Sequence, residues 1–313
     1  MKIKKIKIGG VETPNNVFFA PLAGFSDSAM REVCSLAGAG LCFTEMVSCK
    51  GLKYTPEQSV ELLHTYDTEK LKAVQIFGSD ENIMGEIAKS EHLAKFDIID
   101  INMGCPVPKI YNNNEGSALL KDLLQAEKVI SSVAKCGKPV SVKIRIGLTE
   151  NDYVTREFAR MVEGAGASML TVHGRVRENY YNGEVNFIEI EKAKNAVSIP
   201  VIANGGIFSK EDAEILMEKT GADGVMVARG ALENPLIFEE ILGVSCGYSI
   251  ADLISIQIDR LSKRYGSERS AVIFRKQAAY YLKGINGGKK LKEQVFKSLD
   301  ISEVKEILLS AVK

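Results

Sequence analysis

The chain has 313 residues, of which 45% are hydrophobic and 26% are charged, with 40 basic residues against 40 acidic ones. This composition is that of a globular protein, long enough for one domain of about 250 residues and a small second unit, and it excludes a disordered chain. The amino-terminal stretch MKIKKIKIGG lacks the apolar core of a secretory signal, and no segment approaches the ~18 apolar residues of a membrane span. We expect a cytoplasmic protein without a membrane partner, and a monomer.

Short apolar segments alternate along the chain with amphipathic ones. We predict strands at 17–23, 40–46, 72–77, 97–103, 139–145, 168–173, 199–204 and 223–228. We predict helices at 26–37, 56–64, 80–94, 116–135, 152–165, 186–196, 209–219 and 231–242. Eight such units favour a parallel (β/α)8 TIM barrel, with an open doubly wound sheet as the alternative. Residues 3–14 are expected to form a hairpin that closes the bottom of the barrel.

The positions of the chemically distinctive residues favour the barrel over the open sheet. They fall at or just beyond the carboxyl ends of all eight predicted strands, where a barrel collects its chemistry on one face. These residues are Pro21 to Ala23, Glu45, Gln75, Cys105, Lys143, Arg145, His173, Asn204 and Arg229.

Cys105 lies at the end of the fourth predicted strand, in the sequence DIIDINMGCPVPK at 97–109. A thiol there faces the mouth of a barrel, beside the amide of Asn102, whereas the alternative is a small buried apolar filler. We expect Pro106 and Pro108 to keep the following loop extended rather than helical. The six cysteines show no metal-binding spacing, so we expect reduced thiols and no metal or iron–sulfur centre.

The loops after the seventh and eighth strands favour a phosphate site. They contain Asn204, Gly205 and Gly206, and then Ala228 and Arg229. Glycines let backbone N–H groups approach an anion, and an arginine adds a bidentate contact. The alternative is an ordinary turn and a surface arginine.

Two cations two residues apart, Lys143 and Arg145, lie on the fifth strand and so share its inward face. Buried positive charge needs an anionic partner, such as the pyrimidine end of a reduced flavin ring. The alternative is an ion pair with Glu45 or Asp100. His173 can bind a ring or a phosphate, although it can also be purely structural.

The chain changes character at residue 248, and we divide it into 1–247 and 248–313, the latter called the tail. Helices are predicted in the tail at 249–265, 268–283, 289–297 and 300–312. The tail carries 13 basic against 7 acidic residues, a net charge of +6, which leaves −6 for residues 1–247. Such asymmetry indicates either a nucleic-acid-binding unit or a solvated helical surface. Histidines 64 and 92 are expected at the surface.

Several motifs together resemble the bacterial tRNA-dihydrouridine synthases. They are APLAGFSD at 20–27, VQIFGSD at 74–80, DINMGCPVPK at 100–109, GSALLKD at 116–122, VKIRIG at 142–147, TVHGRVRENYYNG at 171–183, ANGGI at 203–207, VARGALENPLIF at 227–238 and RKQAAYYLKG at 275–284. The cysteine motif is the most specific of them, because the others also occur in flavin barrels such as dihydroorotate dehydrogenases.

The resemblance implies an FMN-dependent enzyme that reduces uridine in tRNA with NADPH. It implies Cys105 as the proton donor. It implies FMN contacts at Pro21, Leu22, Ala23, Gln75, Lys143, His173, Asn204, Gly205, Gly206, Ala228 and Arg229. It places Asn102, Arg145 and Tyr181 near the uracil, and Arg275 and Lys276 in a tRNA-binding helical tail.

The chain departs from the family pattern at three places. Leu22 and Gly206 stand where the family commonly has Met and Asp, and an unusual Tyr-Asn-Asn-Asn run follows Cys105 at 111–114. The other functions considered are a flavin barrel acting on a free small molecule and an RNA-binding protein without turnover.

Overall fold

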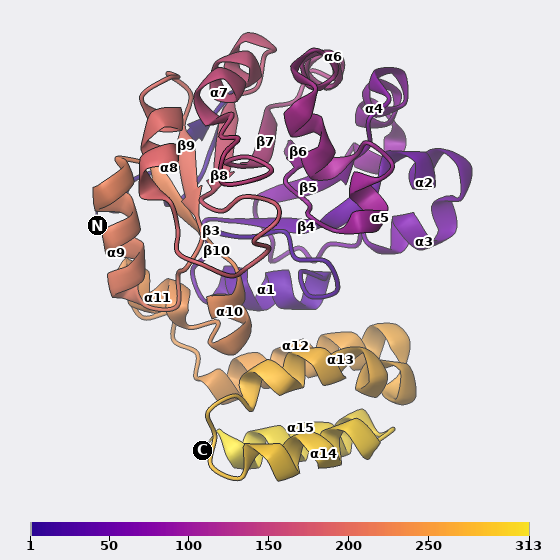
Figure 1. The fold of residues 1–313 in the computed structure, drawn as a ribbon. Helices are drawn as coiled ribbons and strands as arrows, with labels where there is room; N and C mark the ends of the chain where they lie inside the picture. The colour runs from indigo at the N-terminus through magenta and orange to yellow at the C-terminus, as the bar shows by residue number, and fades with distance from the viewer. Residues whose placement is uncertain (1, 313) are drawn as a thin grey trace.

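The computed structural model describes residues 2–312 and contains a closed barrel of eight parallel strands surrounded by helices (Figure 1). The strands pair in the order β10-β3-β4-β5-β6-β7-β8-β9, so the TIM-barrel prediction is confirmed. Their bounds are β3 Val17–Phe19, β4 Leu41–Ser48, β5 Lys72–Phe77, β6 Ile98–Met103, β7 Val140–Arg145, β8 Met169–His173, β9 Val201–Asn204 and β10 Gly224–Val227.

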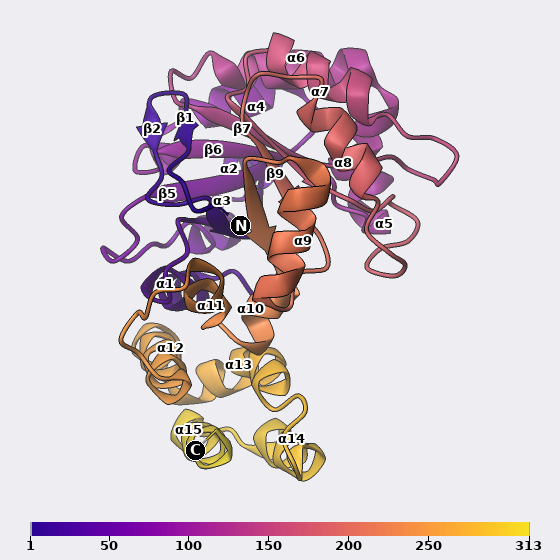
Figure 2. The same ribbon diagram turned by 90° about the vertical axis from the view of Figure 1, so that its left-hand side faces the viewer.

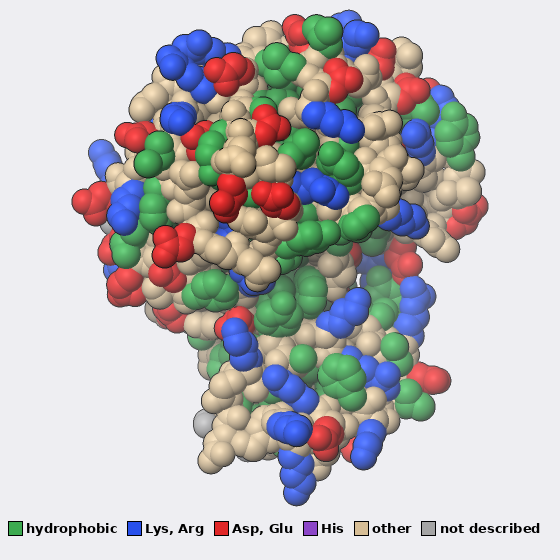
Figure 3. Space-filling view, viewed as in Figure 1, with side chains coloured by type: hydrophobic (Ala, Val, Ile, Leu, Met, Phe, Trp, Pro, Cys, Tyr) green, Lys and Arg blue, Asp and Glu red, His purple; other side chains and the backbone are tan. Residues whose placement is uncertain are grey.

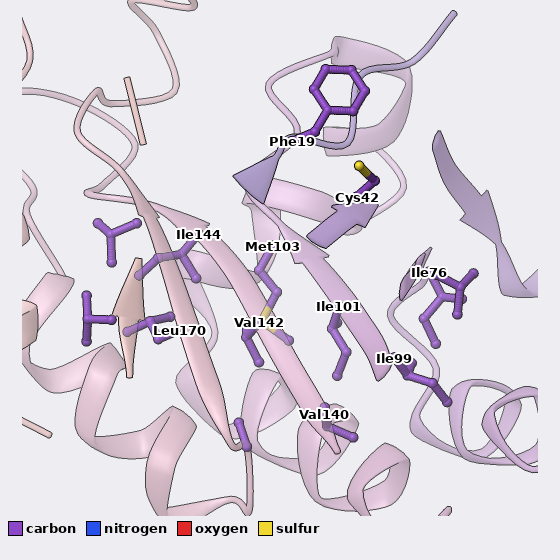
Figure 4. Packing of buried hydrophobic residues seen from close by; sticks show 14 of the residues in the cluster. Phe19, Cys42, Ile76, Ile99, Ile101, Met103, Val140, Val142, Ile144 and Leu170 are labelled. Atoms are coloured by element: carbon purple, nitrogen blue, oxygen red, sulfur yellow. The ribbon is translucent and has the colours of Figure 1, made fainter. Parts of the chain in front are cut away.

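The alternation of side chains between the two faces of each strand places core residues on one face and site residues on the other. Successive side chains of a strand point to opposite faces. Asp100 and Asn102 on β6, and Lys143 and Arg145 on β7, face the barrel interior, as predicted for the two cations. The outward-facing residues pack beneath the helices (Figure 4), and include Ile99, Ile101, Met103, Val140, Val142, Ile144 and Leu170.

Helices cover the outside of the barrel and follow its strands. They are α1 Ser28–Leu36, α2 Cys49–Tyr54, α3 Pro56–Glu61, α4 Glu81–Ala88, α5 Pro108–Tyr111, α6 Leu123–Ala134, α7 Thr155–Gly164, α8 Phe187–Lys194, α9 Lys210–Thr220, α10 Arg229–Glu233 and α11 Ile237–Leu242. Two 3₁₀ helices, η1 Glu91–Leu93 and η2 Gly116–Lys121, complete the set.

Several of the predicted segments are corrected. The helix predicted at 80–94 ends at Ala88, and η1 follows it as a separate element. The helix predicted at 231–242 is two helices, because Pro235 lacks an N–H donor and disfavours helical backbone before it. The helix predicted at 116–135 divides at Asp122, whose carboxylate accepts a hydrogen bond from the N–H of Gln125 and caps α6. The loop after Cys105 is not extended throughout, since Pro108 begins α5 at the position where a missing N–H is tolerated.

The amino-terminal hairpin, β1 Lys7–Ile8 and β2 Val11–Glu12, closes one end of the barrel as predicted. Ile6 and Ile8 are buried in one cluster with inward-facing residues near the strand starts, such as Leu41 and Ile98. Figure 2 shows the hairpin at the end of the barrel opposite α5.

The tail forms a unit of four helices beside the barrel (Figures 1 and 2). They are α12 Ile250–Tyr265, α13 Ser267–Tyr281, α14 Gly288–Lys297 and α15 Ile301–Ala311, close to the predicted bounds. The tail has its own buried cluster, which includes Ile254, Phe274 and Val304. α12 packs along α1, and α13 packs against α10.

Opposite charges meet where the tail packs on the barrel. Arg260 donates to both carboxylate oxygens of Glu32, at 2.6 and 2.8 Å. Two further pairs are Arg269 with Glu61 at 2.8 Å and Lys283 with Glu233 at 2.6 Å. Part of the positive charge of the tail is therefore used in ion pairs with the barrel, which neither the nucleic-acid reading nor the solvated-surface alternative predicted.

His64 is not a free surface residue, contrary to the prediction. Its Nδ1 lies 2.9 Å from the hydroxyl of Ser28, which also accepts a hydrogen bond from Arg264 of the tail. Burial, followed by the charges of Arg264, Lys95 and Arg31, lowers the pKa of His64 to about 4. The histidine is thus held neutral where the tail meets the barrel.

Across residues 2–312, no helix combines the length and the apolar character that crossing a bilayer requires.

Candidate active site

A cavity of about 340 Å³ opens at the carboxyl ends of the barrel strands. Cys105, Asn102, Arg145 and Tyr181 line it, each from the loop or strand where the sequence placed it. The predicted cofactor residues line it too: Pro21, Leu22, Ala23, Gln75, Lys143, His173, Asn204, Gly205, Gly206, Ala228 and Arg229. The fold therefore gathers all the predicted site residues except Arg275 and Lys276.

The cavity wall carries four cationic side chains: Lys143, Arg145, Arg175 and Arg229. None of the four forms an ion pair with an acid among residues 2–312. A wall with this much unpaired positive charge favours an anionic ligand.

Lys143 does not form the ion pair considered as the alternative, with Glu45 or Asp100. Its ammonium group donates to Asn204 Oδ1 at 3.0 Å. Burial, and after it the charge of Arg145, lowers the pKa of Lys143 to about 8. An incoming anion would therefore strengthen the charged form of this lysine.

His173 is buried among these cations, and its nearest polar partner fixes its tautomer. Its Nε2 lies 3.4 Å from Nη1 of Arg175. Since a guanidinium only donates, Nε2 accepts and the ring proton sits on Nδ1. Burial, together with the charges of Arg145 and Lys143, lowers the pKa of His173 well below its usual value. His173 is therefore neutral at physiological pH.

The turn after β9 keeps space open beside the cations. Gly205 and Gly206 have φ angles of +130° and +71°, which L side chains rarely adopt. A Cβ atom on Gly205 would lie 3.2 Å from the ring of His173 and 3.3 Å from Nη1 of Arg175. Glycine here lets a ligand approach the backbone and the cations together.

A chain of hydrogen bonds runs along the cavity floor to Cys105. Gln75 Nε2 donates to Asp100 Oδ2 at 2.7 Å, and Asn102 Nδ2 donates to Gln75 Oε1 at 2.8 Å. Asn102 Oδ1 then accepts from the backbone N–H groups of Gly104, at 3.2 Å, and Cys105, at 2.9 Å. Ser141 donates to the other oxygen of Asp100 at 2.6 Å.

Cys105 is fixed from both sides and faces the cavity. Its carbonyl accepts from the hydroxyl of Ser117 at 2.7 Å, while its N–H is held by Asn102. The residue is 8% exposed. Burial raises the pKa of its thiol above the usual value, although Arg145 and Lys143 oppose this rise. The thiol is therefore protonated at neutral pH and can donate a proton.

Arg145 joins the two loops that border the cavity. It donates to the carbonyl of Gly104 at 2.9 Å, and to those of Val176 and Tyr180 at 3.0 and 2.8 Å. The guanidinium carbon also lies 5.9 Å from the centre of the Tyr181 ring. Arg145 thus has a structural task in addition to the predicted position near a substrate.

Sequence reasoning missed several residues of the cavity wall, among them Arg175, Phe208 and Tyr280. Arg175 follows His173 in a motif where only the histidine was singled out. Phe208 follows the Gly205-Gly206 turn and lies beside Arg229, 5.6 Å from ring centre to guanidinium carbon. Tyr280, on α13, packs edge-on against Phe25 at 5.4 Å. Only the packing of the tail on the barrel brings Tyr280 here, so its sequence position gave no signal.

The structure separates Arg275 from Lys276. Arg275 donates to the carbonyl of Ser298 at 3.1 Å inside the tail, and it forms no ion pair with Glu268 or another acid within residues 2–312. Lys276 is exposed, and its ammonium lies 3.5 Å from where a Cβ of Gly24 would stand at the cavity edge. Lys276 rather than Arg275 is thus available to a ligand outside the cavity.

Comparison with known proteins matches nearly the whole chain. A family model described as dihydrouridine synthase matches residues 18–313. The "tRNA-dihydrouridine synthase B" of Pasteurella multocida is 37% identical over 293 residues, covering 90% of this chain and 87% of the relative. The protein of the same name from Pseudomonas syringae is 35% identical, covering 95% and 91%. A "Probable tRNA-dihydrouridine synthase" of Rickettsia conorii is 33% identical, covering 96% and 94%.

Solved structures share the fold at low sequence identity. Histamine dehydrogenase from Rhizobium sp. 4-9 superposes with a TM-score of 0.61 at 15% identity, covering 82% of this chain and 50% of that one. Morphinone reductase gives a TM-score of 0.56 at 14% identity, covering 80% and 91%.

Proposed function

Because the chain belongs to the dihydrouridine synthase family, and is therefore an oxidoreductase, we propose that it reduces the C5–C6 double bond of uridine in tRNA, using FMN and electrons from NADPH. The observation that carries the proposal is a protonated thiol, Cys105, on the same cavity as four cations without an ion-pair partner in residues 2–312. The names of the relatives support tRNA as the substrate.

The cavity fits FMN by its chemistry. We assign the phosphate to Arg229, His173 and the backbone at Gly205 and Gly206, because the cations and the open turn suit an anion. Lys143 would face the anionic end of the flavin ring. The remaining predicted contacts come from Pro21, Leu22, Ala23, Gln75, Asn204 and Ala228. When bound, FMN supplies the hydride that adds to C6 of the uracil.

Cys105 completes the reduction by giving its thiol proton to C5 of the uracil. The hydride and this proton together saturate the double bond, and the sulfur is left as a thiolate beside Lys143 and Arg145. These two cations already lower the pKa of the thiol, so they also stabilise the thiolate. We assign Asn102, Arg145 and Tyr181 to holding the uracil in the cavity.

We assign tRNA binding to the tail, residues 248–313. A uridine must leave the folded RNA to reach the cavity, which costs a few kcal/mol of stacking that contacts elsewhere must offset. Lysines and arginines outnumber acids on the face of the tail shown in Figure 3. The proposal includes action as a monomer in the cytoplasm, where tRNA is found.

The test is the variant Cys105→Ala, assayed with FMN, NADPH and tRNA lacking dihydrouridine. We expect the variant to keep bound FMN and its reduction by NADPH, and to lose nearly all dihydrouridine by mass spectrometry, because only the proton donor is gone. Dihydrouridine at the wild-type level would show that Cys105 is not the donor.

The other two functions give different results in the same assay. A purified protein without a flavin spectrum would favour an RNA-binding protein without turnover. A reduced flavin that dihydroorotate or another small molecule reoxidises, and tRNA does not, would favour a small-molecule enzyme. Mapping dihydrouridine in RNA from a strain that lacks the gene identifies the uridine concerned.

A further inference from the structure

A tyrosine after Cys105 stacks on an arginine from a different loop. Tyr111 is the last residue of α5, and its ring centre lies 3.6 Å from the guanidinium carbon of Arg177. Arg177 belongs to the loop that joins β8 to α8. The ammonium of Lys121 is also near the ring, at 5.1 Å. Tyr111 and Arg177 are called the clasp below.

The arginine of the clasp is held in place and depends on the ring. Its backbone N–H donates to the carbonyl of Gly147 at 3.0 Å, which anchors it to the loop after β7. Its Nε is buried and has no hydrogen-bond partner within residues 2–312. Because no hydrogen bond within residues 2–312 holds this partly buried guanidinium, the face of Tyr111, 3.6 Å away, is the contact that positions it.

The tyrosine of the clasp is connected to Cys105 by tight packing. The N–H of Tyr111 donates to the carbonyl of Val107 at 3.0 Å, within the turn that begins α5. Beneath α5, a Cβ on Gly116 would lie 2.9 Å from Cγ2 of Ile110 and 3.0 Å from Cβ of Cys105. There is no spare space between these residues, so a shift of α5 is transmitted to Cys105.

We propose that Tyr111 is a positioning residue, which through its stacking on Arg177 holds the loop of Cys105 in the conformation that donates the proton. The clasp ties the outer end of this loop to the β8–α8 loop, while Arg145 ties its inner end, at Gly104, to the same loop. The role in proton donation rests on the proposed function. The restraint on the loop does not, and it is measurable without any turnover.

The test compares Tyr111→Ala and Arg177→Ala with Tyr111→Phe, all as FMN-loaded proteins. The matched control is Asn113→Ala, an exposed side chain in the same loop with no hydrogen bond to residues 2–312. One measurement is the rate at which iodoacetamide labels Cys105, followed by mass spectrometry of its peptide. The others are kcat and KM for tRNA and the rate of FMN reduction by NADPH.

Without the stacking, we expect iodoacetamide to label Cys105 about tenfold faster and kcat to fall about tenfold, the size expected for the loss of a partly buried cation–π contact. Tyr111→Phe keeps the ring and should restore both values, Asn113→Ala should match the wild type, and FMN reduction should stay the same in all variants. An unchanged labelling rate in Tyr111→Ala would show that Tyr111 does not restrain the loop of Cys105. Faster labelling with an unchanged kcat would show that this restraint does not position Cys105 for proton donation. Failure of the proposed function would appear instead as no dihydrouridine formed by the wild-type protein, whatever the labelling rates of the variants.

Discussion

At the scale of single residues, the site depends on the direction of its hydrogen bonds. A carboxylate can only accept a hydrogen bond and a backbone N–H can only donate one. The carboxylate of Asp100 and the N–H of Cys105 therefore fix the two ends of the row of hydrogen bonds that runs through Gln75 and Asn102. Gln75 must then present its nitrogen to Asp100, and Asn102 must present its oxygen to Cys105. An acid that touches no reacting atom therefore sets how two amides are oriented at the cavity floor.

Substitution of Asp100 separates its role as an acceptor from its charge. In Asp100→Leu the amide of Gln75 loses its acceptor, so we expect a loss of about 1–3 kcal/mol of stability and most of the product formation. Asp100→Asn should keep most of both, because its oxygen can accept from Gln75 while its nitrogen donates to Ser141. Chemical denaturation and dihydrouridine yield measure these effects. Equal losses in the two variants would mean that the negative charge, and not the acceptor, is required.

Arg229 is predicted to contribute directly to FMN retention. Arg229→Ala removes the proposed charge-assisted contact to the phosphate, which should cost roughly 1.5–3 kcal/mol of binding free energy. A fluorescence titration of the apoprotein with FMN should show the weakened affinity, and flavin should be lost on dilution. An unchanged dissociation constant would remove Arg229 from the phosphate site.

At the scale of elements, helix α13 carries two adjacent cations with separate tasks. Arg275→Ala should lower the melting temperature, because the side chain bonds to Ser298 across the tail, a contact of about 1 kcal/mol. Lys276→Ala should leave the melt unchanged, weaken tRNA binding and reduce its salt slope by about one, the contribution of one phosphate contact. If Lys276→Ala instead lowered the melting temperature and Arg275→Ala weakened tRNA binding, this division of tasks between the two cations would be wrong.

The sequence was enough to predict the elements that repeat and the residues at their ends. Alternation of apolar residues placed Lys143 inside the barrel, and the barrel rule placed Cys105 at its mouth. What could not be predicted depended on contacts between distant segments. Tyr280 reaches the cavity only because α13 packs on α10, and His64 is partly buried where Arg264 of the tail bonds to Ser28, the partner of the histidine.

At the scale of the whole molecule, the interface between the tail and the barrel contains a polar part that responds to pH. His64 has a pKa of about 4 in the folded protein and about 6.5 when unfolded. The unfolded chain therefore binds more protons between these values, so the contribution of His64 to stability is full above pH 6.5 and is lost as the pH falls towards 4.

The variant His64→Asn isolates this effect, because all other titrating groups are shared with the wild type. Urea denaturation at several pH values between about 7 and 4.5 should show the wild type losing more stability than the variant. Parallel pH dependence in the two proteins would show that His64 does not titrate across folding.

The buried cluster beneath the amino-terminal hairpin fills the barrel near the strand starts, so the cavity opens only where its lining residues lie, at the carboxyl ends of the strands. With the proposed substrates, NADPH and the uridine must then use the same opening in turn, one leaving before the other arrives. Steady-state kinetics should accordingly give parallel lines in double-reciprocal plots, and excess tRNA should inhibit by competing with NADPH for the FMN-loaded enzyme.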